Sequence, residues 1–190
     1  ISERPAWEAL ERLAAIHPRL AYYTLRAACG LSAVPHGPAV VRWLEANTAT
    51  FASVLIPDPR ATALTVLDLS IGSLDLGGNH AFQDVEGFTH NLFQQIADAG
   101  ATIGIGRYNE ARPIYTTDLF RVEGNDMPEW RTIHVGMDLF APASTPVCAP
   151  FDGIVHSFAD NRAELDYGPT IILRHTAGNE DLVFYTLYGH

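Results

Sequence analysis

The segment at residues 56–59, Ile-Pro-Asp-Pro, constrains the fold more than any other part of this chain. Proline cannot donate a backbone hydrogen bond and fixes φ, so the segment fits neither a helix interior nor a central strand. Apolar residues recur at helical spacing before it, whereas short strand-like stretches dominate the end of the chain. The sequence therefore predicts an α+β fold, with N-terminal helices followed by an antiparallel all-β sheet. We expect a helical segment at 1–58, an α/β lead-in at 59–129 and a β domain at 130–190.

Three helices are expected in the first of these segments. Residues 5–16 and 20–29 carry apolar side chains at a spacing of three and four, and His-Pro at 17–18 interrupts the pattern. Gly30 is placed to end the second helix. A third helix is expected after Pro38. Its apolar positions are Val40, Val41, Leu44 and Phe51.

The lead-in at 59–129 mixes the two kinds of pattern. Residues 64–69 predict a buried strand, and residues 101–106 predict another. Between them, residues 85–99 predict a helix with one apolar face, ended by Gly100.

Two polar or glycine-rich features of the lead-in carry little functional signal. Ile-Gly-Ile-Gly at 103–106 matches only part of a dinucleotide-binding fingerprint, because Asn109 stands where the third glycine would be. Polar clusters at 68–73 and 107–110 are interpreted as loop and cap residues rather than as a substrate site.

From residue 130 onward the pattern is that of strands and turns. Residues 133–139 alternate between apolar side chains and the polar set His134, Gly136 and Asp138, which predicts a strand with one polar face.

Further strands are expected downstream. Asp-Gly at 152–153 predicts a tight hairpin turn between strands at 145–149 and 154–158. Strands at 170–174 and 182–188 are expected to form a second hairpin.

Charge and composition restrict the partners of the chain. It has 12 Lys and Arg residues against 22 Asp and Glu residues, a formal net charge of −10, and no cluster of cations. Nucleic acid is therefore not expected as a partner, because its phosphates are bound through clustered cations. No run of 18 apolar residues and no secretory signal pattern is visible, so we expect no membrane partner.

Cys29 and Cys148 are the two cysteines, and two thiols in dissimilar contexts do not form a disulfide framework. Because free cysteine is among the most buried residue types, we expect both to be reduced and mostly buried. Cysteine nucleophile chemistry is not favoured, since Cys148 has the context of a small apolar strand residue.

His134 and Asp138 are the strongest candidates for chemistry, because both residue types are good zinc ligands and both lie on the polar face of one strand. On a straight strand their Cα atoms would lie about 13 Å apart, at roughly 3.3 Å per residue. Two side chains so far apart do not easily meet one ion at bond lengths of about 2 Å. The strand must therefore bend, and Gly136 tolerates a bend. The alternative is a surface histidine and a turn aspartate.

Five short motifs follow one another between residues 131 and 190. They are His134-Val-Gly-Met-Asp138, Ala141-Pro-Ala-Ser-Thr-Pro-Val147, Asp152-Gly-Ile-Val155, Tyr167-Gly168 leading to His175, and Tyr188-Gly-His190. Their order and gaps resemble the M23 (LytM/lysostaphin-like) zinc metallopeptidase domain, truncated at its C-terminus. The sheet expected at 130–190 is then M23-like.

By this resemblance, His134 and Asp138 are zinc ligands, and His190 is a catalytic histidine that positions water or stabilises an oxyanion. The implied reaction is attack of metal-activated water on a peptide bond, with Gly-rich or peptidoglycan-like peptides as substrates. The family takes its third ligand from a later His-x-His-Phe strand, and this sequence stops before one. Catalytic zinc sites usually have three protein ligands. We therefore expect weak zinc binding and no peptidase activity from these 190 residues.

The segment 1–58 carries a second resemblance. A tryptophan-bearing helix is followed by His-Pro-Arg-Leu-Ala at 17–21 and Arg-Ala-Ala-Cys-Gly at 26–30. These strings resemble the tail of an aminoglycoside-phosphotransferase-like kinase domain. The whole chain is similar to the middle of proteins that join such a kinase, an M23 domain and a class III aminotransferase. Pyridoxal phosphate (PLP) would then belong to the parent protein and not to this chain.

Two functions follow from these resemblances. One is a zinc metallopeptidase module, and the alternative is a non-catalytic structural or ligand-binding linker between kinase and PLP-dependent aminotransferase domains. The flanking domains of the same polypeptide are partners in both. Because kinase and aminotransferase chemistry uses cytoplasmic cofactors, a cytoplasmic location is implied.

The remaining histidines have structural interpretations. We expect His156 to be packed and hydrogen-bonded on a strand face, and His175 to brace the sheet at a strand end. No chemistry is assigned to His17, His36, His80 and His90.

Overall fold

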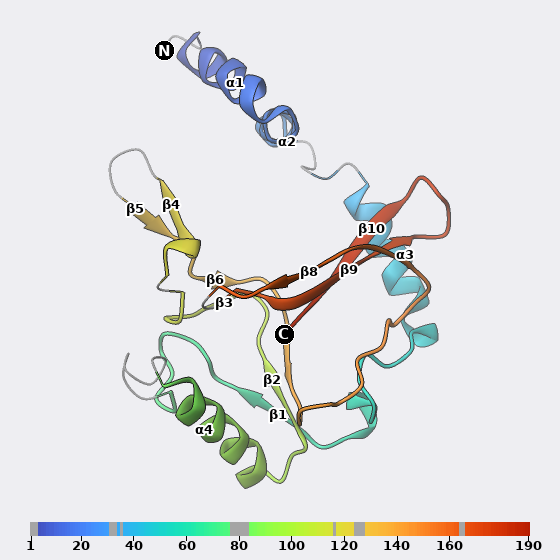
Figure 1. The fold of residues 1–190 in the computed structure, drawn as a ribbon. Helices are drawn as coiled ribbons and strands as arrows, with labels where there is room; N and C mark the ends of the chain where they lie inside the picture. The colour runs from blue at the N-terminus through green and yellow to red at the C-terminus, as the bar shows by residue number, and fades with distance from the viewer. Residues whose placement is uncertain are drawn as a thin grey trace. The chain divides into compact units, whose positions relative to one another are not determined.

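The computed structural model describes residues 4–30, 34, 36–76, 84–115, 117–123, 128–163 and 166–190 (Figure 1). The chain forms two compact units. Unit 1 comprises Ile1–Thr50 and Arg174–Thr186, and unit 2 comprises Phe51–Leu173 and Leu187–His190. Helices and several antiparallel sheets confirm the α+β class. No helix in the described part of the chain has the length and apolar character needed to cross a membrane.

The three helices of unit 1 confirm the periodicity of the sequence. They are α1 (Arg4–Ile16), α2 (Pro18–Ala28) and α3 (Gly37–Asn47), with a 3-10 turn, η1 (Thr48–Thr50), after α3. Proline at the first position of α2 costs no hydrogen bond, because the first N–H groups of a helix have no partner within it. Gly30 follows α2 with a φ of +69°, a conformation that glycine adopts without strain. Phe51 lies beyond the third helix.

Strands β9 (Gly168–Thr176) and β10 (Val183–Gly189) form a hairpin. The end of this hairpin that carries the connecting loop, Arg174–Thr186, belongs to unit 1. His175 is 2% exposed there, and its Nε2 lies 2.8 Å from Thr186 Oγ1 across the hairpin. Its ring stacks on Phe184, with ring centroids 5.1 Å apart, and Phe184 in turn contacts Trp43. The prediction that His175 braces the sheet is confirmed.

The centre of unit 2 is a three-stranded sheet in the order β1 (Leu64–Leu67), β2 (Ile103–Gly106), β7 (Asp138–Phe140). β1 and β2 are parallel, and β7 is antiparallel to β2. The helix α4 (Val85–Asp98) connects the two parallel strands and packs on both of them (Figure 1).

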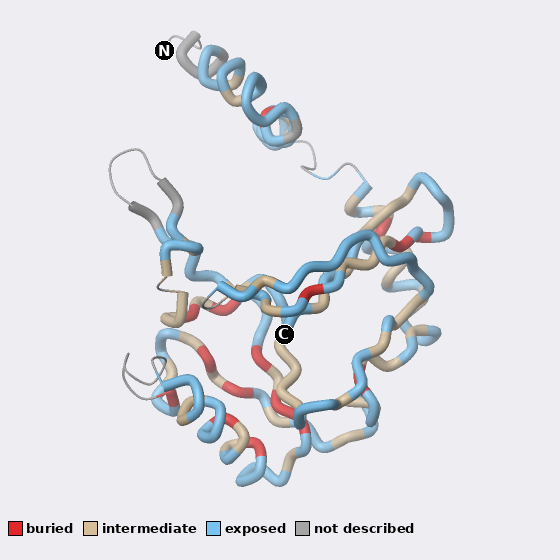
Figure 2. The backbone as a smooth tube through the Cα atoms, viewed as in Figure 1, coloured by how far each residue is buried: buried red, intermediate tan, exposed pale blue. Residues whose placement is uncertain are grey.

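The core of unit 2 lies between α4 and this sheet. Leu92 and Ile96 of α4 pack with Leu67, Leu69 and Leu76, and Figure 2 shows the buried stretches on α4, β1 and β2. Asp84 caps the helix, because its Oδ1 accepts a hydrogen bond of 2.9 Å from Gly87 N. The predicted helix, its apolar face and the two strands are confirmed.

One expectation for β1 is wrong. The sequence predicted a buried strand, but Leu64 and Val66 are exposed, and only Leu67 within the strand is buried. The reason is that β1 is an edge strand of the sheet and α4 covers only one of its faces, so alternate side chains point away from the core.

The remaining strands pair outside the central sheet of unit 2. β3 (Glu110–Ala111) pairs with β6 (Ile133–His134), and β4 (Arg121–Glu123) pairs with β5 (Pro128–Trp130). The third strand of the hairpin sheet is β8 (Ile154–Asn161), in the order β10, β9, β8. The described 3-10 turns of unit 2 are η2 (Pro59–Ala61) and η4 (Asp118–Phe120).

The hairpin predicted around residues 152–153 is wrong. Residues 145–149 form an isolated bridge, Val147 with Leu55, and the Cys148 N–H donates to Val54 O at 2.9 Å. Prolines at 146 and 150 remove two donors from this segment, which prevents a continuous strand. Asp152-Gly153 therefore precedes β8 without closing a hairpin.

The cysteines also differ from expectation. Both are free, as predicted, but Cys29 is exposed and Cys148 is only half-buried. Cys29 comes directly after α2, where a helix end is open to solvent, so the general tendency of cysteine to be buried does not hold at this position.

Asp58 stabilises the turn at η2 and gives a testable pH dependence. Its Oδ1 accepts a 2.8 Å hydrogen bond from Arg60 N, and Oδ2 pairs with Arg60 Nη2 at 2.8 Å. Hydrogen bonds from Arg60 lower the pKa of Asp58 from 3.8 to about 2. Because the folded-state pKa is depressed, this contribution to stability is present above the unfolded-state value and is lost as the pH falls through about 2.

We therefore expect Asp58→Asn to lower the thermal unfolding midpoint at pH 5, and this difference from the wild type to shrink between pH 4 and pH 2. Thermal unfolding followed by circular dichroism over that pH range measures it. A difference that stays constant from pH 5 to pH 2 would contradict the assignment.

Candidate functional site

A break in the strand at residues 133–139 brings His134 and Asp138 together. β6 ends at His134 and pairs with β3, whereas β7 begins at Asp138 and pairs with β2. Residues 135–137 between them are not in a strand, so the bend that the sequence required is present. His134 Nε2 lies 3.6 Å from Asp138 Oδ1.

Gly136 leaves space for the His134 ring at this bend. A Cβ atom added at Gly136 would lie 2.9 Å from His134 Nε2, closer than real Cβ atoms approach, and 3.2 Å from Cε1, which is also tight. The imidazole therefore folds back over position 136 toward Asp138. The sequence identified Gly136 for its backbone freedom, and the structure adds this steric role.

The polar face of this segment is the inner one. The side chains of His134 and Asp138 are 19% and 28% exposed, whereas Ile133, Val135 and Met137 are exposed. The two faces predicted by alternation are therefore present, with the apolar side chains directed to the surface.

A row of alternating charges leads to Asp138. Arg107 pairs with Asp68 and, at 2.8 Å, with Glu110 Oε1. The other carboxylate oxygen of Glu110 accepts from Arg112 Nε at 2.9 Å, and Arg112 Nη2 lies 2.6 Å from Asp138 Oδ2. Glu110 and Arg112 are nearly buried, with side-chain exposures of 3% and 8%.

Strand pairing explains how these residues meet. Glu110 lies directly opposite His134 in the β3–β6 pair, and Gly106 lies opposite Asp138 in the β2–β7 pair. Residues directly opposite in antiparallel strands project to the same face of the sheet. Glu110 is therefore on the face of His134, and Asp138 extends over the position where Gly106 has no side chain.

Gly106 makes room for the ion pair between Arg112 and Asp138. A Cβ atom at Gly106 would lie 2.5 Å from Asp138 Oδ2 and 2.9 Å from Arg112 Nη2. Gly104 has a different neighbourhood, because its Cβ would lie 2.7 Å from Ile96 Cδ1 and 2.8 Å from Leu67 Cδ1. Close packing therefore explains why glycine stands at both positions of the partial dinucleotide fingerprint, and no nucleotide is needed to explain them.

Several polar atoms of the site have no hydrogen bond among the described residues. His134 Nδ1 is buried without a partner. Arg112 Nη2 and Asp138 Oδ2 approach to 2.6 Å as a charge pair, but not at a hydrogen-bonding angle. Oδ2 is thus held mainly by charge, and Oδ1 is the oxygen that faces His134.

His190 lies beside the start of β9. Its N–H donates to Tyr167 O at 2.8 Å, and a Cβ atom at Gly168 would lie 3.7 Å from His190 Nδ1. The structure does not show a contact between the His190 side chain and His134 or Asp138 in the part of the chain that it describes.

Tyr115 links these neighbourhoods electrostatically. Burial raises the pKa of its phenol above the usual value of 10.0; the positive charge of Arg112 opposes this increase, and the negative charges of Asp138 and Tyr167 add to it. Asp138 and Tyr167 therefore both influence the pKa of the Tyr115 phenol. Tyr167 is also the residue whose carbonyl accepts the backbone hydrogen bond of His190.

The His134–Asp138 pair fits two positions of a zinc site. Two atoms bound to a tetrahedral zinc ion at about 2.1 Å lie roughly 3.4 Å apart, close to the observed 3.6 Å. A ligating carboxylate is commonly held through its other oxygen, as Arg112 holds Asp138 Oδ2. Within the described ranges, no group of three or more His, Cys, Asp or Glu side chains is arranged to hold a metal ion.

The other residues considered from the sequence are His156, Asp152 and His80. His156 is exposed rather than packed, because β8 is an edge strand with exposed residues on both faces. Its Nδ1 lies 3.1 Å from Ser157 Oγ. Asp152 is exposed before β8, and His80 lies outside the described residues.

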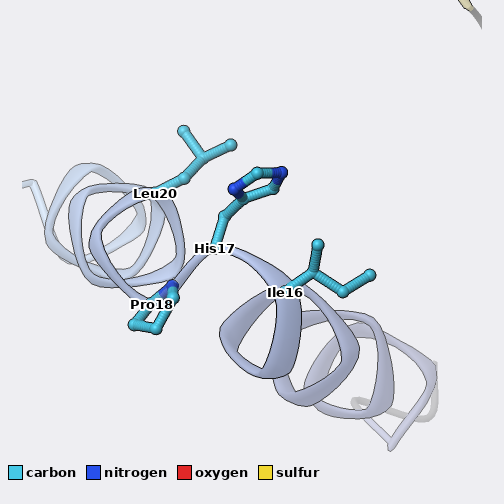
Figure 3. A pocket seen from close by; sticks show the side chains of 4 residues that line it. All are labelled: Ile16, His17, Pro18 and Leu20. Atoms are coloured by element: carbon cyan, nitrogen blue, oxygen red, sulfur yellow. The ribbon is translucent and has the colours of Figure 1, made fainter.

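A hollow of about 450 Å³ lies in unit 1, at the junction of α1 and α2. Its lining residues are Ile16, His17, Pro18 and Leu20. Figure 3 shows Ile16, His17 and Leu20 projecting to one side of the junction, with Pro18 directed to the other. This lining offers one imidazole and otherwise apolar groups, so the hollow contains no constellation for catalysis.

Sequence reasoning missed Glu110 and Arg112. The cluster at 107–110 was interpreted as loop and cap residues, but Arg107 and Glu110 belong to the charge row beside His134 and Asp138. A local signal was available, because Glu110 and Arg112 are two positions apart, a spacing that puts both side chains on one face of a strand.

Comparison of the chain with models of protein families, with curated proteins and with solved structures gives no significant match.

Proposed function

We propose that unit 2 carries the zinc site of an M23-type metallopeptidase module, with His134 and Asp138 as two of the ligands. The observation that carries this proposal is the separation of 3.6 Å between His134 Nε2 and Asp138 Oδ1. Two residues four positions apart reach this distance only because the strand breaks at 135–137 and Gly136 leaves room for the imidazole.

The residues of this site would have different roles in metal binding and catalysis. His134 Nε2 and Asp138 Oδ1, which face each other, would hold the metal, and Arg112 pairs with the other oxygen of Asp138. A bound zinc ion supplies Lewis acidity, which activates water at neutral pH and polarises a peptide carbonyl. His190 would position water or stabilise the negative charge that develops on the carbonyl oxygen.

The proposal extends to the surroundings of this module. Its substrate class would be Gly-rich or peptidoglycan-like peptides, and its partners the flanking domains of the same polypeptide. The helices of unit 1 would include the tail of a phosphotransferase-like domain, in a cytoplasmic protein that also contains a PLP-dependent aminotransferase domain. The short motifs between residues 131 and 190 support the peptidase module, and the strings at 17–21 and 26–30 support the phosphotransferase-like tail.

Zinc titration of the purified chain tests the proposal. We expect one zinc ion per chain, bound weakly, because two protein ligands are fewer than the three of most catalytic sites. Competition with a chromophoric chelator measures the affinity, and the visible spectrum of the Co²⁺-loaded chain reports the coordination number. No metal binding by the folded chain would contradict the zinc site.

The alternative is a non-catalytic linker module, and the ion pair of Arg112 with Asp138 favours it. This pair and Glu110 explain the position of the Asp138 carboxylate without any metal. A folded chain that binds no zinc would support the linker function.

A further inference from the structure

We propose that Arg112, held by Glu110, is a positioning residue that turns the Asp138 carboxylate so that only Oδ1 faces His134 and the metal. This inference rests on the zinc site proposed above and adds a determinant of its geometry. It assigns Asp138 a monodentate role, with Oδ1 as ligand and Oδ2 as anchor.

The guanidinium of Arg112 bridges two carboxylates. Its Nε donates to Glu110 Oε2 at 2.9 Å, and its Nη2 lies 2.6 Å from Asp138 Oδ2. A planar guanidinium keeps these two nitrogens at a fixed separation, so anchoring Nε on Glu110 also fixes Nη2 against Asp138. An ammonium group is a single point charge and cannot reproduce this bridge.

This bridge is part of a buried framework. Arg112 and Glu110 are 8% and 3% exposed, and the Arg112 N–H donates to Thr132 O at 2.8 Å, next to β6. Gly106 leaves the space in which Arg112 Nη2 meets Asp138 Oδ2. Thr132 and Glu110 therefore hold Arg112 in place, and Gly106 leaves the room in which it meets Asp138 Oδ2.

The positive charge of Arg112 is compensated by its neighbours. A cation beside a metal ligand weakens metal binding unless its charge is compensated. Here the row of Asp68, Arg107, Glu110, Arg112 and Asp138 contains three carboxylates and two guanidinium groups. One negative charge remains, so Arg112 can orient Asp138 without cancelling its attraction for a cation.

The experiment compares zinc affinity and the Co²⁺ spectrum of the whole chain with those of four variants. Arg112→Met removes the bridge, and Glu110→Gln removes the negative charge that anchors Arg112 Nε while leaving the guanidinium in place. The matched control is Arg107→Met, which removes another arginine from the same Glu110 carboxylate without contact to Asp138. Circular dichroism establishes that each variant is folded, and Glu110→Gln keeps the test usable if Arg112→Met does not fold.

We expect Arg112→Met and Glu110→Gln to weaken zinc binding about 10–100-fold, the usual effect of removing a group that orients a ligand. Their Co²⁺ spectra should shift, because a released Asp138 can bind through both oxygens. Arg112→Lys should recover only part of the affinity. Arg107→Met should not weaken zinc binding, because it removes a positive charge from the row without releasing Asp138.

Other outcomes overturn the inference in distinguishable ways. Unchanged affinity and spectra in Arg112→Met and Glu110→Gln, or an equal loss in Arg107→Met, would leave the zinc site standing and remove the positioning role. Tighter binding in Arg112→Met would show that Arg112 competes with the metal. No binding by the wild type would overturn the zinc site and this inference together.

Discussion

Gly106→Ala is expected to destabilise unit 2 by about 3 kcal/mol and to abolish the pairing of Arg112 with Asp138. The added Cβ would lie 2.5 Å from Asp138 Oδ2 and 3.0 Å from Asp138 Cβ. Asp138 is the residue directly opposite Gly106 in β7, so its Cβ cannot move away without disrupting the strand pair. Overpacking costs about 1–3 kcal/mol, and separating a buried ion pair about 3–5 kcal/mol, which the partial exposure of Asp138 reduces.

Gly104→Ala is the matched control for this substitution. It lies two residues earlier on the same face of β2, and its Cβ would meet Ile96 and Leu67 rather than the charged pair. It should cost about 1–3 kcal/mol by overpacking and leave zinc affinity unchanged. Urea unfolding and zinc titration of both variants separate the two effects. Equal zinc affinity in Gly106→Ala and the wild type would contradict the steric role of Gly106.

Local sequence patterns predicted the elements whose cause is local. The helix α4 follows from apolar residues at helical spacing, a capping Asp84 and Gly100 with a φ of +67°. The break between β6 and β7 was also predictable, because two ligand candidates four residues apart on a straight strand could not share an ion. Both predictions used information contained within about 15 residues.

The parts that were mispredicted depend on contacts between distant segments. Residues 145–149 bridge to residues 52–56 instead of forming a hairpin, and no local pattern specifies that partner. Burial of β1 and of His156 depends on whether another element covers each face, and both strands lie at sheet edges.

The residues that surround Asp138 could not be predicted for the same reason. Glu110, Arg112 and Gly106 meet the His134–Asp138 pair through the register of β3 with β6 and of β2 with β7. Such a register is set by packing over the whole unit rather than by the residues of one strand. Sequence reasoning could identify the two candidate ligands, but not the arginine that holds one of them.

His134→Ala and Asp138→Asn should each weaken zinc binding by more than about 100-fold, because removing a ligand costs more than removing a group behind it. The zinc-dependent rise in unfolding temperature should also vanish in these variants, because zinc stabilises the folded state only when it binds to it. Asp138→Asn keeps the side-chain volume at the Arg112 contact but removes the charge that pairs with Arg112, so circular dichroism must establish that this variant is folded.

His156→Ala and Asp160→Asn serve as controls of the same residue types. Both positions are exposed on β8, and Asp160 pairs with Arg162 rather than with the site. Zinc affinity and the zinc-dependent shift in unfolding temperature should match the wild type in both. If the ligand variants bind zinc as the controls do, the ion is held elsewhere. The 3.6 Å approach of His134 to Asp138 is then a structural contact beside the charge row, as in the linker alternative.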